Sequence, residues 1–184
     1  MLWGNKHIPT ASLSKKVSDN TITCSSCSKT FNLAGLQASF VVSPNMDVKK
    51  TYDKFWQKLE IHRNNCFSLV AMQAAYREGE EWLEQLLPYI EENIKFVNEY
   101  CKKYIPQIKA SIPESTYLVW LDCRELGLSN EELSEFMIKK AHLGLNSGNS
   151  FSRSLTGYMR LNTACPRETL KKAMKQLEEA VKNR

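Results

Sequence analysis

Residues 26–42 read SCSKTFNLAGLQASFVV and carry the most informative pattern of the chain. It begins as a loop rich in serine around Lys29 and leads into an apolar run, residues 38–43, whose β-branched side chains and length predict a strand. Residues 21–26, just before the loop, predict another short strand. Hydroxyls and loop amides can hold a phosphate, and a lysine beside them can react with a carbonyl group. A serine-rich loop with one lysine is also typical of a solvated turn, so the loop alone leaves both interpretations open.

Helices follow this segment as far as residue 104, whereas residues 1–20 are polar and irregular. Apolar residues at helical spacing predict helices over residues 47–62, 67–77 and 80–104. The first 45 residues therefore contain only two strands, and two strands alone form a marginal sheet. Strands of an α/β sheet normally lie among several neighbours and are covered on both faces. The sequence thus looks like a chain that has been cut within a sheet.

Residues 105–184 show the pattern of a compact α+β domain. Strands are predicted over residues 115–122 (STYLVWLD), 142–146 and 158–162. Ser129 and Glu132 have the spacing of a capping box, which opens a helix that extends to about residue 140. An apolar stripe after Pro166 predicts the last helix. We therefore expect two domains, residues 1–104 with the long connecting helix, and residues 105–184.

Composition excludes several classes of protein. The 184 residues are 42% hydrophobic and 24% charged, as in ordinary globular domains. The formal charge of +5 is spread over predicted helix surfaces, so we expect no nucleic-acid partner. No apolar run approaches the ~20 residues of a membrane span, and the N-terminus does not resemble a signal peptide. These features predict a cytoplasmic protein with free thiols and no membrane partner.

Two cysteines, Cys24 and Cys27, form a CxxC pair that could suggest a metal or redox site. A structural zinc site needs about four ligands, usually with a second such pair. The other four cysteines stand alone, and the three histidines, His7, His62 and His142, are scattered along the chain. A redox CxxC would normally open a helix after a strand, not a polar loop. We therefore expect no metal site.

Four stretches, taken in order, resemble one enzyme family. SCSKTFNLAGLQASFVV closely resembles the cofactor-lysine segment of class I/II aminotransferases and of the related cystathionine β-lyases. MLWGNKHIP, at the start of the chain, resembles the stretch that follows the aspartate at the cofactor ring in that family. STYLVWLD resembles its small-domain strand, and RLNTACPRETL resembles its terminal arginine segment. The C–S lyase branch is the most similar subgroup. The resemblance implies a remnant of a fold-type-I large domain (α/β), followed by the small C-terminal α+β domain, with pyridoxal 5′-phosphate (PLP) as cofactor.

The resemblance also assigns roles to individual residues. Lys29 corresponds to the lysine that forms the Schiff base with PLP and then moves the Cα proton of the substrate. Ser26 corresponds to a phosphate ligand, and Ser28 is a weaker cofactor-binding candidate. Arg160, in YMRLN, corresponds to the arginine that binds the α-carboxylate of the amino-acid substrate, a group that a guanidinium can bind through two hydrogen bonds.

The chain departs from the family pattern at several positions. Many relatives have a phosphate-binding arginine about eight residues after the lysine, where this chain has Gln37, so the phosphate must be held differently. In the loop before Arg160, relatives usually have Pro-Gly and an aromatic-Gly pair. Here these pairs are Ser147–Gly148 and Phe151–Ser152, which should loosen the loop.

Two functions follow from these observations. The first is the C-terminal part of a PLP-dependent enzyme that acts on amino acids, by C–S β-elimination or by transamination, and that is a homodimer at full length. The family is roughly twice this long, and the residues that stack on the cofactor ring and pair with its nitrogen would precede this chain, so we expect the chain alone to be inactive. The alternative is a non-catalytic truncated chain or interaction domain with no PLP bound.

Overall fold

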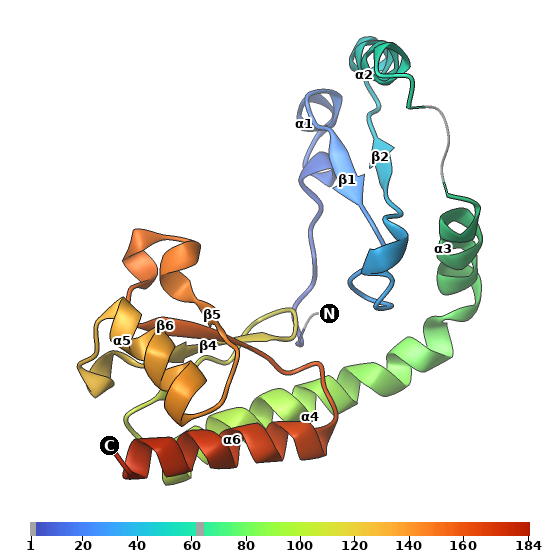
Figure 1. Cartoon of the computed structure of the whole chain (residues 1–184). Coiled ribbons are helices and arrows are strands. Elements are labelled where there is room, and N and C mark those ends of the chain that lie inside the picture. The colour runs from blue at the N-terminus through green and yellow to red at the C-terminus, as the bar shows by residue number, and fades with distance from the viewer. Residues whose placement is uncertain (1–2, 62–64) are drawn as a thin grey trace. The chain divides into compact units, whose positions relative to one another are not determined.

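The computed structural model describes residues 3–61 and 65–184, which form two compact units (Figure 1). The N-terminal unit comprises residues 6–85, and the C-terminal unit comprises residues 3–5 and 86–184. The helix α4 (Glu80–Tyr104) belongs to both units. The boundary between the two compact units lies inside α4, because the second half of this helix is buried in the C-terminal core. The assignment of residues 1–104 and 105–184 to the large and small domains of a parent enzyme stays a prediction.

Among its described residues, the N-terminal unit contains a two-stranded antiparallel sheet, three α-helices, two 3₁₀ turns and the start of α4. Its strands are β1 (Thr23–Ser25) and β2 (Phe40–Val42), and its helical elements are η1 (Thr10–Ser12), α1 (Lys15–Asp19), η2 (Ala34–Leu36), α2 (Met46–Lys58) and α3 (Cys66–Glu78). Asn45 begins α2 by accepting hydrogen bonds from the amides of residues 47 and 48. The helix ends at Lys58, four residues before the predicted end, and residue 62 lies outside the described residues.

Very little of the N-terminal unit is buried. Among its described residues only Cys27 and Ser68 are buried, whereas Ile22 and Val42 beside the sheet are 51% and 50% exposed. Contacts between segments still order the unit. The ring of Phe40 in β2 lies 6.3 Å from that of Tyr76 in α3, and the hydroxyl of Ser68 donates a hydrogen bond to the carbonyl of Leu36.

The C-terminal unit is built on a four-stranded antiparallel sheet with the order β3–β4–β6–β5. The strands are β3 (Lys109–Ala110), β4 (Leu118–Asp122), β5 (Asn146–Ser147) and β6 (Tyr158–Asn162). Successive side chains of a strand point to opposite faces. One face presents buried apolar residues, namely Val119 and Leu121 of β4 and Met159 and Leu161 of β6. The other face presents Trp120 and Arg160, which are only partly buried.

Helices cover the apolar face of this sheet. The remaining helical elements are η3 (Arg124–Leu126), α5 (Asn130–Glu135), the π-helical turn η4 (Phe136–Lys140), η5 (Gly148–Ser150), η6 (Arg153–Leu155) and α6 (Arg167–Lys182). In Figure 1 the C-terminal half of α4 runs beside α6, and the hydroxyl of Tyr100 in α4 donates a 2.5 Å hydrogen bond to Glu178 in α6. Leu170, Met174 and Leu177 of α6 join the same core as Ile90, Ile94 and Val97 of α4.

Several predicted elements are confirmed and others are shorter than predicted. The helix over residues 80–104 has the predicted bounds, and both hydrogen bonds of the capping box at Ser129 and Glu132 are present. The strand predicted over residues 115–122 begins only at Leu118, because Thr116 has a φ of 70°, which extended backbone does not allow. Among the described helices, none has both the length and the apolar composition of a membrane span.

Candidate functional site

Lys29 lies on a short turn that connects β1 to η2. The amide of Phe31 donates a 3.0 Å hydrogen bond to the carbonyl of Cys27, and the amide of Leu33 donates one of 2.8 Å to the carbonyl of Ser28. These two bonds close the backbone around the lysine, and Cys27 before it is 2% exposed. Lys29 itself is exposed. The turn therefore fixes its backbone and presents its amine outward.

The aromatic ring of Phe31 ties this turn to the junction of α3 and α4. It stacks on Trp82 with 5.7 Å between the ring centres. It also lies directly against Gly79, where a side-chain methyl would collide with the ring and come within 2.5 Å of the carbonyl of Ala75. Glycine is thus required at position 79 by this contact. No local motif marks Phe31 or Gly79 as positioning residues, because their contact joins segments almost fifty residues apart.

Ser26 and Ser28 form a local hydrogen-bonded pair beside Lys29. The amide of Ser28 donates a 3.0 Å hydrogen bond to Oγ of Ser26, whose hydroxyl lies 2.8 Å from Oγ of Ser28 and 2.5 Å from the carbonyl of Ala38. The single proton of the Ser26 hydroxyl is therefore used within the chain. Because the carbonyl of Ala38 can only accept, the Ser26 proton satisfies it and the Ser28 proton fills the contact between the two hydroxyls. The Ser28 hydroxyl can donate to a bound oxyanion after it rotates away from Ser26.

This set of groups fits a phosphate-bearing aldehyde such as PLP. A primary amine can attack an aldehyde, and a hydroxyl donor can bind a phosphate oxygen. Gln37, which stands where many relatives have an arginine, is exposed and has a φ of 52°. Gln37 supplies no positive charge. The groups near Lys29 that can bind a phosphate are therefore hydroxyl donors and Lys29 itself, with no guanidinium at position 37.

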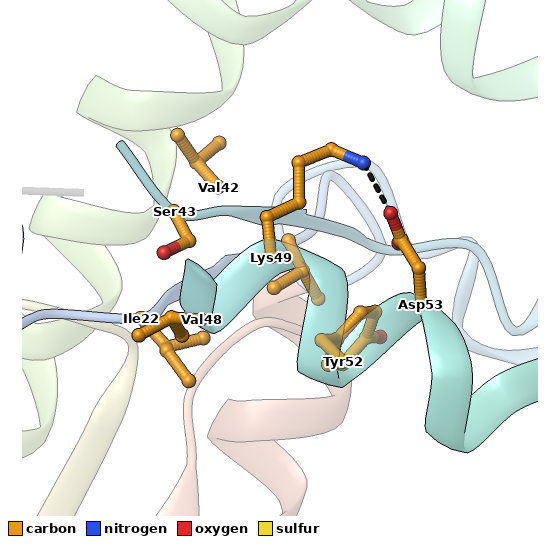
Figure 2. Close-up of a pocket in the computed structure, with 8 residues that line it drawn as sticks. Ile22, Val42, Ser43, Val48, Lys49, Tyr52 and Asp53 are labelled. Carbon is orange, nitrogen blue, oxygen red and sulfur yellow. Dashed lines mark hydrogen bonds and ion pairs between the residues drawn. The ribbon is translucent and has the colours of Figure 1, made fainter. Parts of the chain in front are cut away.

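A separate cavity of about 350 Å³ lies between β2 and α2 and is shown in Figure 2. Apolar side chains, including Ile22, Val42 and Val48, form much of its wall. Its two charged residues, Lys49 and Asp53, are paired with each other at 2.5 Å, as the dashed line in Figure 2 shows. Lys29 does not line this cavity. This cavity therefore does not belong to the proposed cofactor site.

Arg160 lies in the middle of β6 in the C-terminal unit, whereas Lys29 lies in the N-terminal unit. The backbone of Arg160 is paired with Trp120 on one side and with Asn146 on the other, so all three side chains share one face of the sheet. Nη2 of Arg160 donates a 3.0 Å hydrogen bond to Oδ1 of Asn146. Its Cζ lies 4.5 Å from the centre of the Phe151 ring, a cation–π distance.

The carboxylate on this face of the sheet is already paired. Asp122 in β4 accepts hydrogen bonds of 2.9 and 2.7 Å from Nε and Nη2 of Arg124. These bonds hold the pKa of the Asp122 carboxyl below its usual value. Among the described residues of the C-terminal unit, no carboxylate lies within 4.0 Å of Arg160. Arg160 therefore retains an unneutralised positive charge on a partly exposed sheet face.

Comparisons with known proteins cover nearly the whole chain. Residues 1–177 match the family model for aminotransferases of class I and II. Cystathionine β-lyase PatB of Bacillus subtilis (strain 168) is 37% identical over 181 residues, which are 98% of this chain and 47% of PatB. The chain thus spans about half the length of the curated relatives it matches. The predicted similarity to cystathionine β-lyases is confirmed.

Solved structures agree with the predicted fold class. A PLP-bound structure from Clostridium difficile 630, provisionally assigned as an aminotransferase, has a TM-score of 0.95 and 48% identity over 98% of this chain and 46% of that one. Cystalysin of Treponema denticola, which contains PLP, has a TM-score of 0.95 and 30% identity over 99% of this chain and 46% of its own. The α/β remnant followed by an α+β domain is therefore confirmed. Because the family match extends over almost all of its residues, this chain belongs to the class I and II aminotransferase family.

Proposed function

We propose that this chain is the C-terminal part of a PLP-dependent enzyme that acts on amino acids. The observation that supports this most is the exposed Lys29, held on an ordered turn within a segment that resembles the family's cofactor-lysine motif. We propose C–S β-elimination as the reaction, because PatB is named a cystathionine β-lyase, and transamination as the alternative, because other relatives are named aspartate aminotransferases. We expect the complete enzyme to be a cytoplasmic homodimer.

Lys29 is proposed to perform two tasks with one amine. Its Nζ would hold the cofactor covalently and would move the proton at the substrate Cα. When bound, PLP supplies the electron sink for the reaction. The anchors on both sides of the turn, Cys27 and Phe31, favour a fixed position for the Lys29 backbone. A fixed backbone limits the search of the long side chain and so favours an aligned proton transfer.

Arg160 and the two serines are proposed to bind the charged ends of substrate and cofactor. The guanidinium of Arg160 has donors left after its bond to Asn146 and can hold the α-carboxylate through two hydrogen bonds. Ser28 is proposed to donate to the cofactor phosphate, and Ser26 to hold the backbone of Ser28 by accepting the 3.0 Å hydrogen bond from its amide. A carboxylate bound through two parallel hydrogen bonds would have a fixed orientation at Arg160.

We further propose that the 184-residue chain alone catalyses no turnover. Its proposed inventory contains an attachment lysine, hydroxyl donors and a carboxylate arginine. We propose no residue of this chain as the group that pairs with the nitrogen of the PLP ring or as the group that stacks on that ring. Catalytic groups that act as a unit lose almost all their effect when several are missing. Turnover by the purified chain at rates typical of PLP enzymes would contradict this proposal.

Reductive labelling tests the attachment lysine directly. The chain is incubated with increasing PLP, reduced with borohydride and digested, and each lysine is scored for phosphopyridoxyl mass. Lys29 is expected to be labelled at lower PLP concentration than any other lysine, and Lys29→Ala to remove that site alone. Lys15→Ala is the matched control, because Lys15 is a highly exposed lysine of the same unit. Uniform labelling of surface lysines, with no preference for Lys29, would favour the non-catalytic alternative.

A further inference from the structure

The side chains around Arg160 form a partial cradle that the family resemblance does not assign. Oδ1 of Asn146 accepts a 3.0 Å hydrogen bond from Nη2 of Arg160. The centre of the Phe151 ring lies 4.5 Å from Cζ of the guanidinium. Trp120 packs edge-on against Phe151, with ring centres 5.6 Å apart at 87°. Trp120 lies in β4, Asn146 lies in β5 and Phe151 lies in the loop after η5. The strand register brings Trp120 and Asn146 to either side of Arg160.

We propose that Asn146 and Phe151 are positioning residues that orient the Arg160 guanidinium for a carboxylate. This inference rests on the proposed function, in which Arg160 binds the α-carboxylate of an amino acid. A carboxylate needs two parallel N–H donors in one plane, so rotation of the guanidinium would break the match. Asn146 fixes one edge of the plane, and the ring of Phe151 restricts its rotation by contact and by cation–π attraction.

The loop that contains Phe151 is held by internal hydrogen bonds, although its sequence predicts a loose loop. The amide of Phe151 donates a 2.9 Å hydrogen bond to the carbonyl of Gly148, and the hydroxyl of Ser150 donates one of 2.6 Å to the carbonyl of Ser147. Gly148 is buried, and a Cβ there would lie 3.0 Å from the Cβ atoms of both Leu155 and Tyr158. The loop thus holds Phe151 at a fixed place above the sheet, although the ring is 51% exposed.

Asn146 is well suited to this task because it is neutral. Its carbonyl oxygen orients the guanidinium without cancelling the charge, which remains available to a ligand. An aspartate at this position would form an internal ion pair and compete with the ligand's carboxylate. Because Asn146 and Phe151 are both exposed, their substitution should leave the fold intact.

The test compares two small ligands of the complete PLP-loaded enzyme that includes this chain. α-Aminoisobutyrate has an α-carboxylate but no Cα–H, so it binds without turnover, and isopropylamine is the same molecule without the carboxylate. Dissociation constants are measured from the absorbance change of the bound cofactor. Asn146→Asp should weaken α-aminoisobutyrate binding by about fivefold or more. Phe151→Leu should weaken it by about two- to fivefold, whereas Phe151→Tyr should retain the affinity. Isopropylamine affinity should not change.

Two control variants separate the possible failures. Asn149→Asp adds the same charge to the same loop at an exposed residue and should change neither affinity. Arg160→Gln should weaken α-aminoisobutyrate binding on the order of 30-fold or more. If Arg160→Gln has no carboxylate-dependent effect, the proposed role of Arg160 is wrong. If it has that effect but Asn146→Asp and Phe151→Leu both behave like Asn149→Asp, the role of Arg160 stands and the positioning inference is overturned.

Discussion

At the scale of single residues, Gly79 controls the turn that contains Lys29. Its missing side chain leaves room for the ring of Phe31, which stacks on Trp82. Gly79→Ala would force the ring away, and overpacking of this kind costs roughly 1–3 kcal/mol. The turn should then open more often, so trypsin should cleave after the exposed Lys29 about tenfold faster or more.

The matched control is Gly35→Ala in η2. Gly35 lies in the same unit, and an added methyl there would meet nothing within 4 Å. Cleavage after Lys29 should keep its original rate in this variant. Equal acceleration in Gly79→Ala and Gly35→Ala would show that the contact between Phe31 and Gly79 does not hold the turn.

Two buried thiols predict a pH dependence of stability. Burial raises the pKa of Cys101 to about 12, and that of Cys123 also to about 12, from an ordinary value of 9.0. Below pH 9.0 both thiols are protonated in the folded and unfolded chains. Between pH 9.0 and about 12 the unfolded chain binds fewer protons than the folded chain, so stability falls as pH rises through this window.

Urea unfolding of the C-terminal unit at a series of pH values measures this effect. The midpoint should be steady up to about pH 8 and then decrease steadily toward pH 11. In the folded chain a thiolate-selective reagent should label the exposed Cys24 and Cys66 quickly, and Cys101 and Cys123 only as fast as the unit unfolds. Fast labelling of Cys101 or Cys123 under native conditions would contradict the burial-raised pKa values.

The sequence motifs locate single candidate residues but not the tertiary partners of those residues. The resemblance pointed to Lys29 and Arg160 by motif, and the structure places each on an ordered element. It gave no indication of Asn146 as a partner of Arg160, because that contact depends on which strand pairs with β6. Strand pairing is a tertiary property, and no residue near Arg160 in the sequence encodes it.

At the scale of elements, a buried asparagine joins α4 to the beginning of α6. Asn93 is fully buried, and its Nδ2 donates hydrogen bonds of 2.8 and 3.0 Å to the carbonyls of Thr163 and Cys165. Its Oδ1 accepts a hydrogen bond from Nε of Arg167. Asn93→Ala would leave these buried groups unpaired, which should destabilise the C-terminal unit by roughly 2–4 kcal/mol.

Denaturant unfolding of Asn93→Ala and of a control variant measures the change in the free energy of unfolding. Asn149→Ala is the control, because Asn149 is exposed and its substitution should change the free energy of unfolding by no more than about 0.5 kcal/mol. The same small change in Asn93→Ala would mean that water replaces the lost hydrogen bonds. The link between α4 and α6 would then depend on apolar packing alone.

Helices were predicted better than strands, for a physical reason. Helix ends are encoded locally by caps such as Ser129, whereas a strand depends on distant partners. The predicted strand over residues 142–146 is reduced to Asn146–Ser147, because His142 has a φ of 55°. The strands predicted over residues 21–26 and 38–43 likewise keep only three residues each.

At the scale of the whole molecule, the two units differ greatly in how much they bury. Every residue of the main hydrophobic cluster lies in the C-terminal unit. The N-terminal unit has a two-stranded sheet, and large apolar side chains such as Phe67 and Val70 of α3 are 71% and 66% exposed. Buried apolar area is the main source of stability, and a two-stranded sheet contributes little by itself. The C-terminal unit should therefore be much the more stable of the two.

Native-state hydrogen exchange tests this order directly in the 184-residue chain. Amides of β4, β6, α6 and the second half of α4 should exchange only by unfolding of the whole C-terminal unit. Amides of β1 and β2 should exchange orders of magnitude faster, through openings that leave the C-terminal unit intact. Added denaturant should release the N-terminal unit first, because this unit has less stability to lose. Equal protection of β1 and β4 would instead require that the apolar side chains of the N-terminal unit be covered in solution, by a second copy of the chain or by another polypeptide.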